Sequence, residues 1–128
     1  MRWWARGIVA AALACVVATP AGADPALEAE LQAKWKALRE ALSRDDVPGA
    51  LALIASRSRE SYREPFLALQ RVGELRSAAN DLCTLHRIEH EREAVVEYDC
   101  RGMRNGFEQS FPVRFIRDAD GVWRIWRF

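Results

Sequence analysis

The chain has 128 residues, of which 19 are basic and 18 acidic, and its formal charge is +1. This even balance argues against a nucleic-acid-binding surface and against a basic, membrane-coating patch. The length suffices for one small domain with a modest core but not for two.

The first 23 residues have the organisation of a secretory signal peptide. Arg2 and Arg6 form a basic start, residues 7–20 are mostly apolar, and a small-residue cleavage site ends at Ala23. We therefore expect a single periplasmic or secreted domain at residues 24–128. Its formal charge is −1, because two of the 19 basic residues are removed with the signal. No second apolar run reaches the about 20 residues that a membrane helix needs, so no membrane span is expected.

A lipoprotein signal is an alternative interpretation of the same segment. Ala12, Leu13 and Ala14 precede Cys15 and loosely match the motif before a lipidated cysteine. The apolar run before Cys15 is short, so cleavage after Ala23 is the preferred prediction.

Residues 24–72 have the spacing of helices. Asp24 suits an N-cap and Pro25 the first turn. Apolar residues then recur three and four positions apart, on one helical face, at Leu27, Leu31, Trp35, Leu38 and Leu42. A second, short helix is expected after Asp46, and Pro65 predicts a break or restart in a third helical segment. Residues 73–81 show no clear pattern.

Residues 82–128 have the pattern of antiparallel strands joined by turns. Asn105-Gly106 is a strong hairpin signal because both residues tolerate positive φ, and Asp118 to Gly121 marks another turn. A weaker turn is expected at Glu91-Arg92. The sequence thus predicts an α+β domain, with N-terminal helices packed on one face of a curved antiparallel sheet of about four strands.

The turns define an expected strand register. A two-residue loop at Glu91-Arg92 places Cys83 opposite Cys100, and the loop at Asn105-Gly106 places Cys100 opposite Phe111. Both loops assign one set of residues to the face toward the helices: Cys83, Leu85, Val96, Tyr98, Cys100, Phe111, Val113 and Phe115. A three-residue loop before the last strand places Ile125 opposite Phe115 and Trp123 opposite Arg117, whereas another loop length would turn that strand over.

The terminal hairpin carries a family resemblance. Residues 115–125, Phe-Ile-Arg-Asp-Ala-Asp-Gly-Val-Trp-Arg-Ile, resemble the last hairpin of NTF2-like (SnoaL-like) α+β domains, which have a cystatin-like architecture. Residues 35–66 are similar to the helical half of small exported bacterial proteins with that ending, including Ala41-Leu42 and the step from Tyr62 to Phe66. The resemblance implies a fold that hosts enzymes, binders and assembly domains alike.

Cys83 and Cys100 are expected to form a structural disulfide. Facing residues on neighbouring strands bring Cβ atoms to about 4.5–5.5 Å, and an exported domain meets an oxidising environment. Two free thiols and a redox-active pair are the alternatives.

The motif His86-Arg87-Ile88-Glu89-His90 matches the H-x-x-E-H pattern of some zinc peptidases. On a strand, however, His86 and His90 lie about 13 Å apart, too far to share one ion. We therefore expect no metal, and instead an exposed ladder in which His86 faces Glu97 and Glu97 faces Arg114.

Acid–base chemistry has only a few candidate residues: Asp81, Glu97, Tyr98 and Asp99. In enzymes that this fold resembles, such as ketosteroid-isomerase-like members, an acid lies inside the cavity, where burial tunes its pKa. The expected register turns Glu97 and Asp99 to the opposite face. We therefore assign no catalytic residue and no cofactor.

Two surfaces are predicted to bind other molecules. A pocket between helices and sheet, suited to a small apolar ligand, would be lined by Trp35, Tyr62, Phe66, Tyr98 and Trp123, although aromatic residues at such spacing also form cores. An apolar row on the outer sheet face, suited to homodimerisation, would comprise Ile88, Val95, Ile116, Trp126 and Phe128. Residues 73–81 of the chain itself could instead cover Trp126 and Phe128.

Together these observations predict an exported, NTF2-like binding domain without catalytic activity. The alternatives are an isomerase- or hydrolase-like enzyme of the same fold, and a structural assembly partner in the cell envelope. An enzyme requires an open cavity with an internal acid of raised pKa, whereas an assembly partner requires a filled core.

Overall fold

The computed structural model describes residues 24–128, so the predicted signal peptide, the cleavage site at Ala23 and the alternative lipidation at Cys15 lie outside the described residues. The fold is α+β, with four helices followed by a four-stranded antiparallel sheet whose strands lie in sequence order. The elements are α1 (Pro25–Ser43), α2 (Val47–Ala52), α3 (Arg59–Arg71), α4 (Leu75–Asn80), β1 (Thr84–Arg92), β2 (Val95–Arg104), β3 (Phe107–Arg117) and β4 (Trp123–Arg127).

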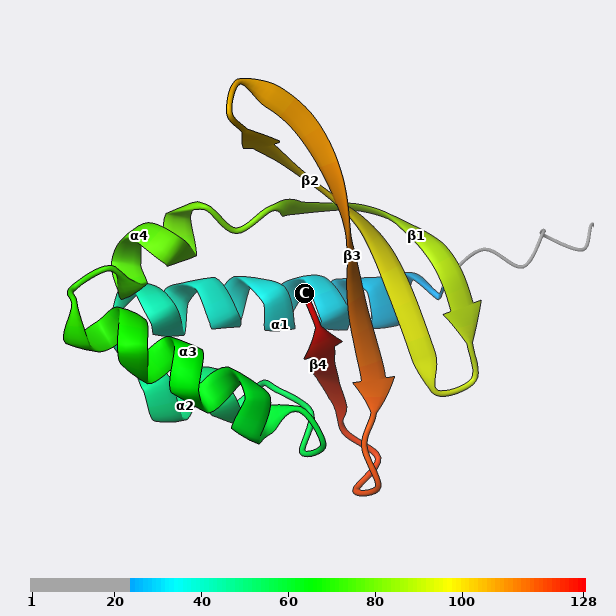
Figure 1. Ribbon diagram of the computed structural model, residues 1–128. Helices are drawn as coiled ribbons and strands as arrows, with labels where there is room; N and C mark the ends of the chain where they lie inside the picture. Colours follow the sequence, from blue (N-terminus) through cyan, green and yellow to red (C-terminus); the bar gives the residue numbers. More distant parts are fainter. Residues whose placement is uncertain (1–23) are drawn as a thin grey trace, which may run out of the picture.

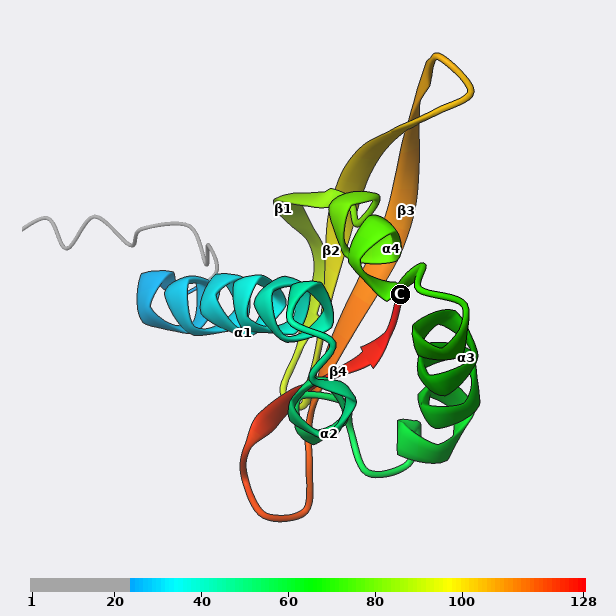
Figure 2. The ribbon, with the colours of Figure 1, turned by 90° about the vertical axis from the view of Figure 1, so that its left-hand side faces the viewer.

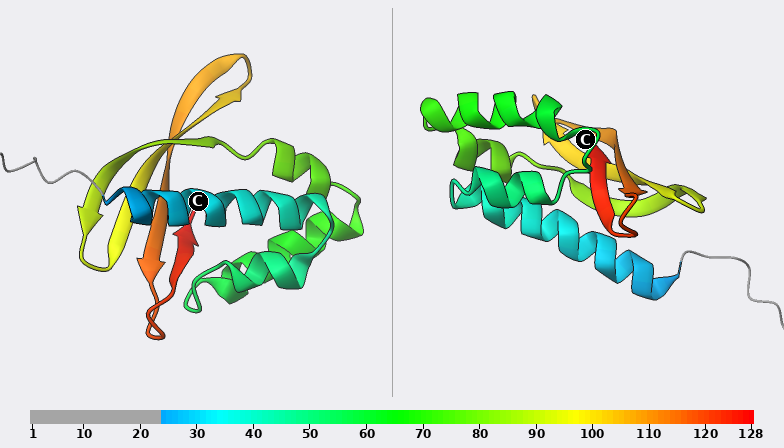
Figure 3. Two further views of the ribbon diagram at one scale, coloured as in Figure 1. Left: turned by 180° about the vertical axis from the view of Figure 1, so that it is seen from behind. Right: turned by 90° about the horizontal axis from the view of Figure 1, so that it is seen from below.

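Helix α1 crosses one face of the curved sheet, and α2, α3 and α4 gather around its C-terminal end (Figures 1 and 3). The hairpin of β2 and β3 extends beyond the helices as an arm, residues 102–109 (Figure 2). Within residues 24–128, no helix combines the length and apolar character needed to cross a membrane.

The first two helices begin where the sequence predicts. The Asp24 carboxylate accepts a hydrogen bond from the Ala26 N–H, and the Asp46 carboxylate accepts one from the Gly49 N–H, both at 2.9 Å. The apolar face of α1 is confirmed, since four of its five predicted residues are buried, at Leu31, Trp35, Leu38 and Leu42.

The predicted break at Pro65 is wrong, because α3 runs continuously through it. Proline removes the N–H that would bond to the carbonyl of Ser61, four residues earlier. Ser61 is exposed, so water can satisfy that carbonyl and the helix continues. Helix α4 lies in a segment where no pattern predicts a helix, and it forms because Leu75 and Ala79 are fully buried against the core.

The register of β2 and β3 is confirmed along its whole length. Cys100 pairs with Phe111 and Tyr98 with Val113, as the two-residue turn requires. Asn105 and Gly106 have φ values of 53° and 80°, the left-handed conformation of that turn.

The register of β1 and β2 corrects the prediction. The turn lies at residues 93–94 and not at Glu91-Arg92, and the pairing shifts twice, at His86 and at Glu89. Leu85 consequently pairs with Cys100, and Ile88 with Tyr98. The two shifts are β-bulges, which insert an unpaired residue and twist the strand. Cys83 still lies beside Cys100, with 5.5 Å between the Cα atoms and the sulfur atoms at disulfide distance.

The last hairpin has the predicted pairing at its start. Ile125 lies opposite Phe115 and Trp123 opposite Arg117. The register then shifts, with Trp126 as the extra residue of β4. The outer edge of β4 is covered by the chain after α2, because the Ala55 N–H donates to the Ile125 carbonyl at 2.7 Å and Ile125 N–H to the Leu53 carbonyl at 2.9 Å.

Candidate functional site

A groove of about 730 Å³ lies between α2 and α3. Its apolar wall comes from Val47, Pro48, Leu51 and Ala52 of α2 and from Leu67 of α3. Its polar lining comes from Arg59, Arg63 and Gln70 of α3 and from Arg124 of β4. None of these nine lining residues is acidic, so the groove combines an apolar wall with three guanidinium groups.

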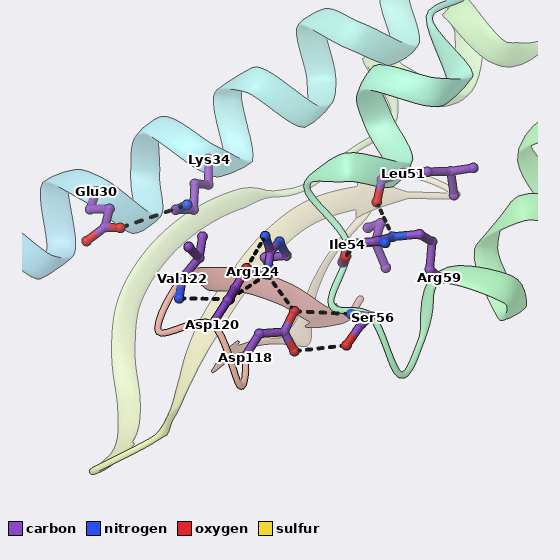
Figure 4. Close-up of polar contacts among 10 residues, drawn as sticks. All are labelled: Glu30, Lys34, Leu51, Ile54, Ser56, Arg59, Asp118, Asp120, Val122 and Arg124. Atoms are coloured by element: carbon purple, nitrogen blue, oxygen red, sulfur yellow. Dashed lines mark hydrogen bonds and ion pairs between the residues drawn. The ribbon is translucent and has the colours of Figure 1, made fainter.

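Arg59 is held in place by backbone carbonyl groups at the end of α2. Its Nε donates to the carbonyl of Leu51 at 3.0 Å, and its Nη2 donates to that of Ile54 at 3.2 Å (Figure 4). The Leu51 carbonyl, in the last turn of α2, also accepts the Ile54 N–H at 3.1 Å, and a positive charge at that end of the helix is favoured by the helix dipole. Arg59 forms no ion pair with a carboxylate in the described part of the chain, so its charge stays uncompensated.

Arg63 lies one helical turn further along the groove. Its Nη2 pairs with the exposed Glu60 carboxylate at 3.1 Å, while its Nε is buried and has no hydrogen-bond partner within residues 24–128. Gln70 lies two helical turns after Arg63. Its side-chain amide donates a hydrogen bond to the carbonyl of Asp45 at 2.8 Å and so closes this end of the groove. An unpaired buried donor is costly unless a bound group accepts its hydrogen bond.

Arg124 stands at the other end of the groove within a polar network. Its Nη1 lies 2.9 Å from the Asp118 carboxylate, and its Nη2 lies 2.8 Å from that of Asp120 (Figure 4). Asp118 also accepts hydrogen bonds from the N–H and hydroxyl of Ser56, which ties the last turn to the loop after α2. The hydrogen bonds from Arg124 lower the pKa of Asp120, and those to both carboxylates raise the pKa of Arg124.

The sequence analysis did not identify any residue of this groove. Arginines three and four positions apart on a polar helix have the appearance of a solvated face. The available signal was the spacing of Arg59, Arg63, Leu67 and Gln70, which places them along one side of α3.

The predicted aromatic pocket is not assembled. Trp35, Phe66, Tyr98 and Trp123 belong to the core and Tyr62 packs against it. Trp35, Tyr62 and Tyr98 also border three separate cavities. Trp35 borders a cavity of about 380 Å³ near Phe128, and its indole N–H donates to the Cys83 carbonyl at 2.9 Å. Tyr62 contacts Phe66, with 5.8 Å between ring centroids, but faces Phe128.

Tyr98 is buried in the core, and its hydroxyl has no hydrogen-bond partner among the described residues. Burial, with smaller contributions from the negative charges of Glu28 and Glu91, raises its pKa to about 12. The hydroxyl therefore stays protonated throughout the neutral range.

Asp99 is buried on the opposite face. Its carboxylate accepts hydrogen bonds from the Ser110 hydroxyl and from Arg101, and these lower its pKa. The expected pair of Glu97 and Arg114 is confirmed, but His90, and not His86, lies opposite Glu97 because the turn lies at residues 93–94. Asp81 follows α4 and borders the cavity of Trp35.

Residues 24–128 contain no group of three or more His, Cys, Asp or Glu side chains positioned to hold a metal ion. His86 and His90 each sit exposed on β1.

The predicted association row is not contiguous. Val95 and Ile116 do pair, but Ile88 packs toward the core opposite Tyr98. Phe128 also turns to the helix side, because the bulge at Trp126 reverses the following residues. No protein-family model, curated protein or solved structure matches the chain.

Proposed function

We propose that the protein is an exported, NTF2-like binding domain without catalytic activity, and that its site is the groove between α2 and α3. Its ligand is a small molecule with an apolar body and an anionic group. The observation that carries this proposal is the lining of the groove, where an apolar wall meets Arg59, which has no carboxylate partner among residues 24–128, and the carboxylate-paired Arg63 and Arg124.

The size and rigidity of the groove support binding. Small-molecule sites commonly enclose about 300–1,000 Å³ and combine apolar walls with a few fixed polar groups. Arg59 and Gln70 are already held by hydrogen bonds, so binding does not have to order them. Arg59 has no carboxylate partner among residues 24–128, so its charge can attract an anion.

The cysteine pair supports export. A disulfide between Cys83 and Cys100 persists in an oxidising compartment, in agreement with the signal-peptide pattern of residues 1–23. The overall arrangement of helices on one face of a curved sheet is compatible with an NTF2-like domain.

The acidic residues favour binding over catalysis. An isomerase-like enzyme of this fold requires a carboxylic acid whose pKa is raised by burial. Asp99 shows the opposite shift, since the Ser110 hydroxyl and Arg101 lower its pKa.

The test uses the mature domain, residues 24–128, and three twelve-carbon probes below their micelle concentrations: dodecanoate, dodecanol and dodecyltrimethylammonium. Calorimetry should show that dodecanoate binds more tightly than either of the others. Arg63→Gln should weaken dodecanoate binding by about tenfold, the effect of one charge-assisted hydrogen bond. The matched control is Arg71→Gln, which removes an exposed arginine from the same helix outside the groove.

Equal affinity for dodecanoate and dodecanol would contradict the anionic part of the proposal. The absence of binding by all three probes would contradict the groove as a site for an amphipathic ligand. An equal loss of dodecanoate affinity in Arg63→Gln and Arg71→Gln would show that binding depends only on the net charge of the domain.

A second candidate function is self-association through the arm. Met103 and Phe107 at its end are 70% and 72% exposed, which is unusual for such large apolar side chains. Sedimentation of the mature domain should show a dimer that Phe107→Ser dissociates. A monomer at high protein concentration would exclude this candidate.

A further inference from the structure

A second cavity, of about 500 Å³, lies on the other side of α3 from the groove. Its lining residues are Arg57, Ser58, Ser61, Tyr62, Trp126, Arg127 and Phe128. They come from the start of α3 and from the end of β4, two segments far apart in the sequence that meet beside each other. None of the side chains is acidic.

Two guanidinium groups flank the indole ring of Trp126. The Cζ of Arg57 lies 5.4 Å from the ring centroid and that of Arg127 lies 5.5 Å from it. Cation–π contacts of this kind hold a guanidinium over the ring face and leave the N–H groups at its edge free to donate. Trp126 has this position because it is the extra residue of the bulge in β4.

The charges of both arginines are uncompensated. Within residues 24–128, neither Arg57 nor Arg127 forms an ion pair with a carboxylate, although Arg63, Arg101, Arg114 and Arg124 all do. Two fixed positive charges beside one cavity create a potential that attracts an anion.

Further donors line the same cavity. Ser58 is 7% exposed, precedes α3 as its N-cap residue, and makes no side-chain hydrogen bond to the helix. Ser61 lies in the first turn of α3 and lines the same cavity. The partial positive charge of the start of a 13-residue helix adds to the attraction. The Tyr62 hydroxyl, in contrast, is occupied by the backbone of Phe128.

We propose that this cavity binds a phosphate group, either free phosphate or the phosphomonoester headgroup of a lipid. Two guanidinium groups and two serine hydroxyls offer more donors than the two coplanar oxygens of a carboxylate can accept. Free phosphate and a phosphate monoester have three or four terminal oxygens in a tetrahedral arrangement and carry close to two negative charges, which match the two arginines. The site is separate from the groove and does not depend on the function proposed for it.

The experiment is a titration of the mature domain with inorganic phosphate at constant ionic strength, followed by two-dimensional NMR. The Trp126 indole N–H and the Nε–H groups of Arg57 and Arg127 should shift with one saturation curve. Arg57→Gln and Arg127→Gln should each weaken binding by about tenfold or more. The matched control is Arg117→Gln, because the Arg117 guanidinium also lies over an indole ring, at 6.0 Å from that of Trp123.

The amide spectrum of each variant reports whether the fold is retained. Vesicles that contain phosphatidic acid, whose headgroup is a phosphate monoester, are compared with vesicles that contain phosphatidylglycerol, an anionic phosphate diester, so that binding to a lipid phosphomonoester is separated from attraction to a negative surface. If the domain binds the phosphatidic acid vesicles but not free phosphate, and if this binding depends on Arg57 and Arg127, the ligand is a lipid headgroup. If it binds free phosphate but not the vesicles, with the same dependence, the ligand is free phosphate. The proposal is overturned if neither probe shifts the Trp126 signal, or if Arg117→Gln weakens binding as much as the other two variants.

Discussion

The rings of Tyr62 and Phe128 stack with their centroids 4.7 Å apart and their planes 9° from parallel. The Tyr62 hydroxyl accepts a hydrogen bond from the Phe128 N–H at 2.9 Å and donates one to the Phe128 carbonyl at 3.2 Å. Trp35 of α1 meets the same phenyl ring edge-on, at 5.3 Å. The end of β4 is therefore joined to both α1 and α3 by aromatic contacts and by a closed pair of hydrogen bonds.

Tyr62→Phe should destabilise the domain by about 1 kcal/mol, because the stacking remains but both hydrogen bonds to Phe128 are lost. Urea unfolding of the mature domain measures this difference in the free energy of unfolding. Tyr62→Ala also removes the ring and its stacking on Phe128, so it should lower the free energy of unfolding by clearly more than Tyr62→Phe does. A Tyr62→Phe variant as stable as the wild type would show that the hydrogen bonds contribute nothing.

Tyr98→Phe should have the opposite outcome, since the Tyr98 hydroxyl is buried without a partner in the described chain. At pH 7 the variant should be as stable as the wild type or more stable. The pKa of Tyr98 is raised to about 12, so the unfolded chain ionises first, from about pH 10. The stability that the protonated Tyr98 hydroxyl contributes is fully present below about pH 10. It is lost as the pH rises toward about 12.

The wild type should consequently lose about 1 kcal/mol more stability than Tyr98→Phe between pH 8 and pH 11. Denaturant unfolding at both pH values tests this difference. If the wild type and Tyr98→Phe lose the same stability between pH 8 and pH 11, the Tyr98 hydroxyl is hydrated or hydrogen-bonded in solution.

The strand pairings show where sequence reasoning succeeds. Asn105-Gly106 forces one turn geometry, and every pair of β2 and β3 follows from it. The turn at residues 93–94 contains Glu93 and Ala94, neither of which favours a turn, so its position was misjudged. The bulges at His86 and Trp126 have no sequence signal at all, because tertiary packing decides where a strand accommodates an extra residue.

The candidate sites were harder to predict than the fold. Leu31 and Leu38 follow a local period that reveals a buried face, whereas the roles of Arg59 and Arg63 depend on how closely α2 approaches α3. The position of Phe128 likewise depends on a single inserted residue in β4. Such relationships involve residues distant in the sequence, and a local pattern carries no information about them.

Cys83→Ala/Cys100→Ala should lower the melting temperature of the mature domain by on the order of 10 °C. In the chain-entropy model, a disulfide between residues 17 apart in the sequence contributes about 3 kcal/mol, and each kcal/mol shifts Tm by about 4–8 °C in a domain of this size. Thermal unfolding with and without reductant measures the effect. The reductant should lower Tm in the wild type and leave the double variant unchanged; an equal Tm in all four samples would show that the bond is absent.

Asp120→Asn should reduce the dependence of stability on acid pH. The hydrogen bonds from Arg124 lower the pKa of Asp120 in the folded protein, so the folded state binds fewer protons than the unfolded chain does near pH 4. The stability that this carboxylate contributes is present above its ordinary pKa of about 4 and is lost as the pH falls through the lower, folded value.

The variant should therefore be less stable than the wild type at pH 7, and the two should converge as the solution becomes acidic. Asparagine keeps an oxygen that can accept the Val122 N–H, so the turn itself is retained while the charge that faces Arg124 is lost. Asp81→Asn is the matched control, because Asp81 forms no ion pair within residues 24–128. A difference between wild type and Asp120→Asn that stays constant from pH 7 to pH 2 would show that Arg124 stabilises the turn by packing against it and not by binding the Asp120 carboxylate.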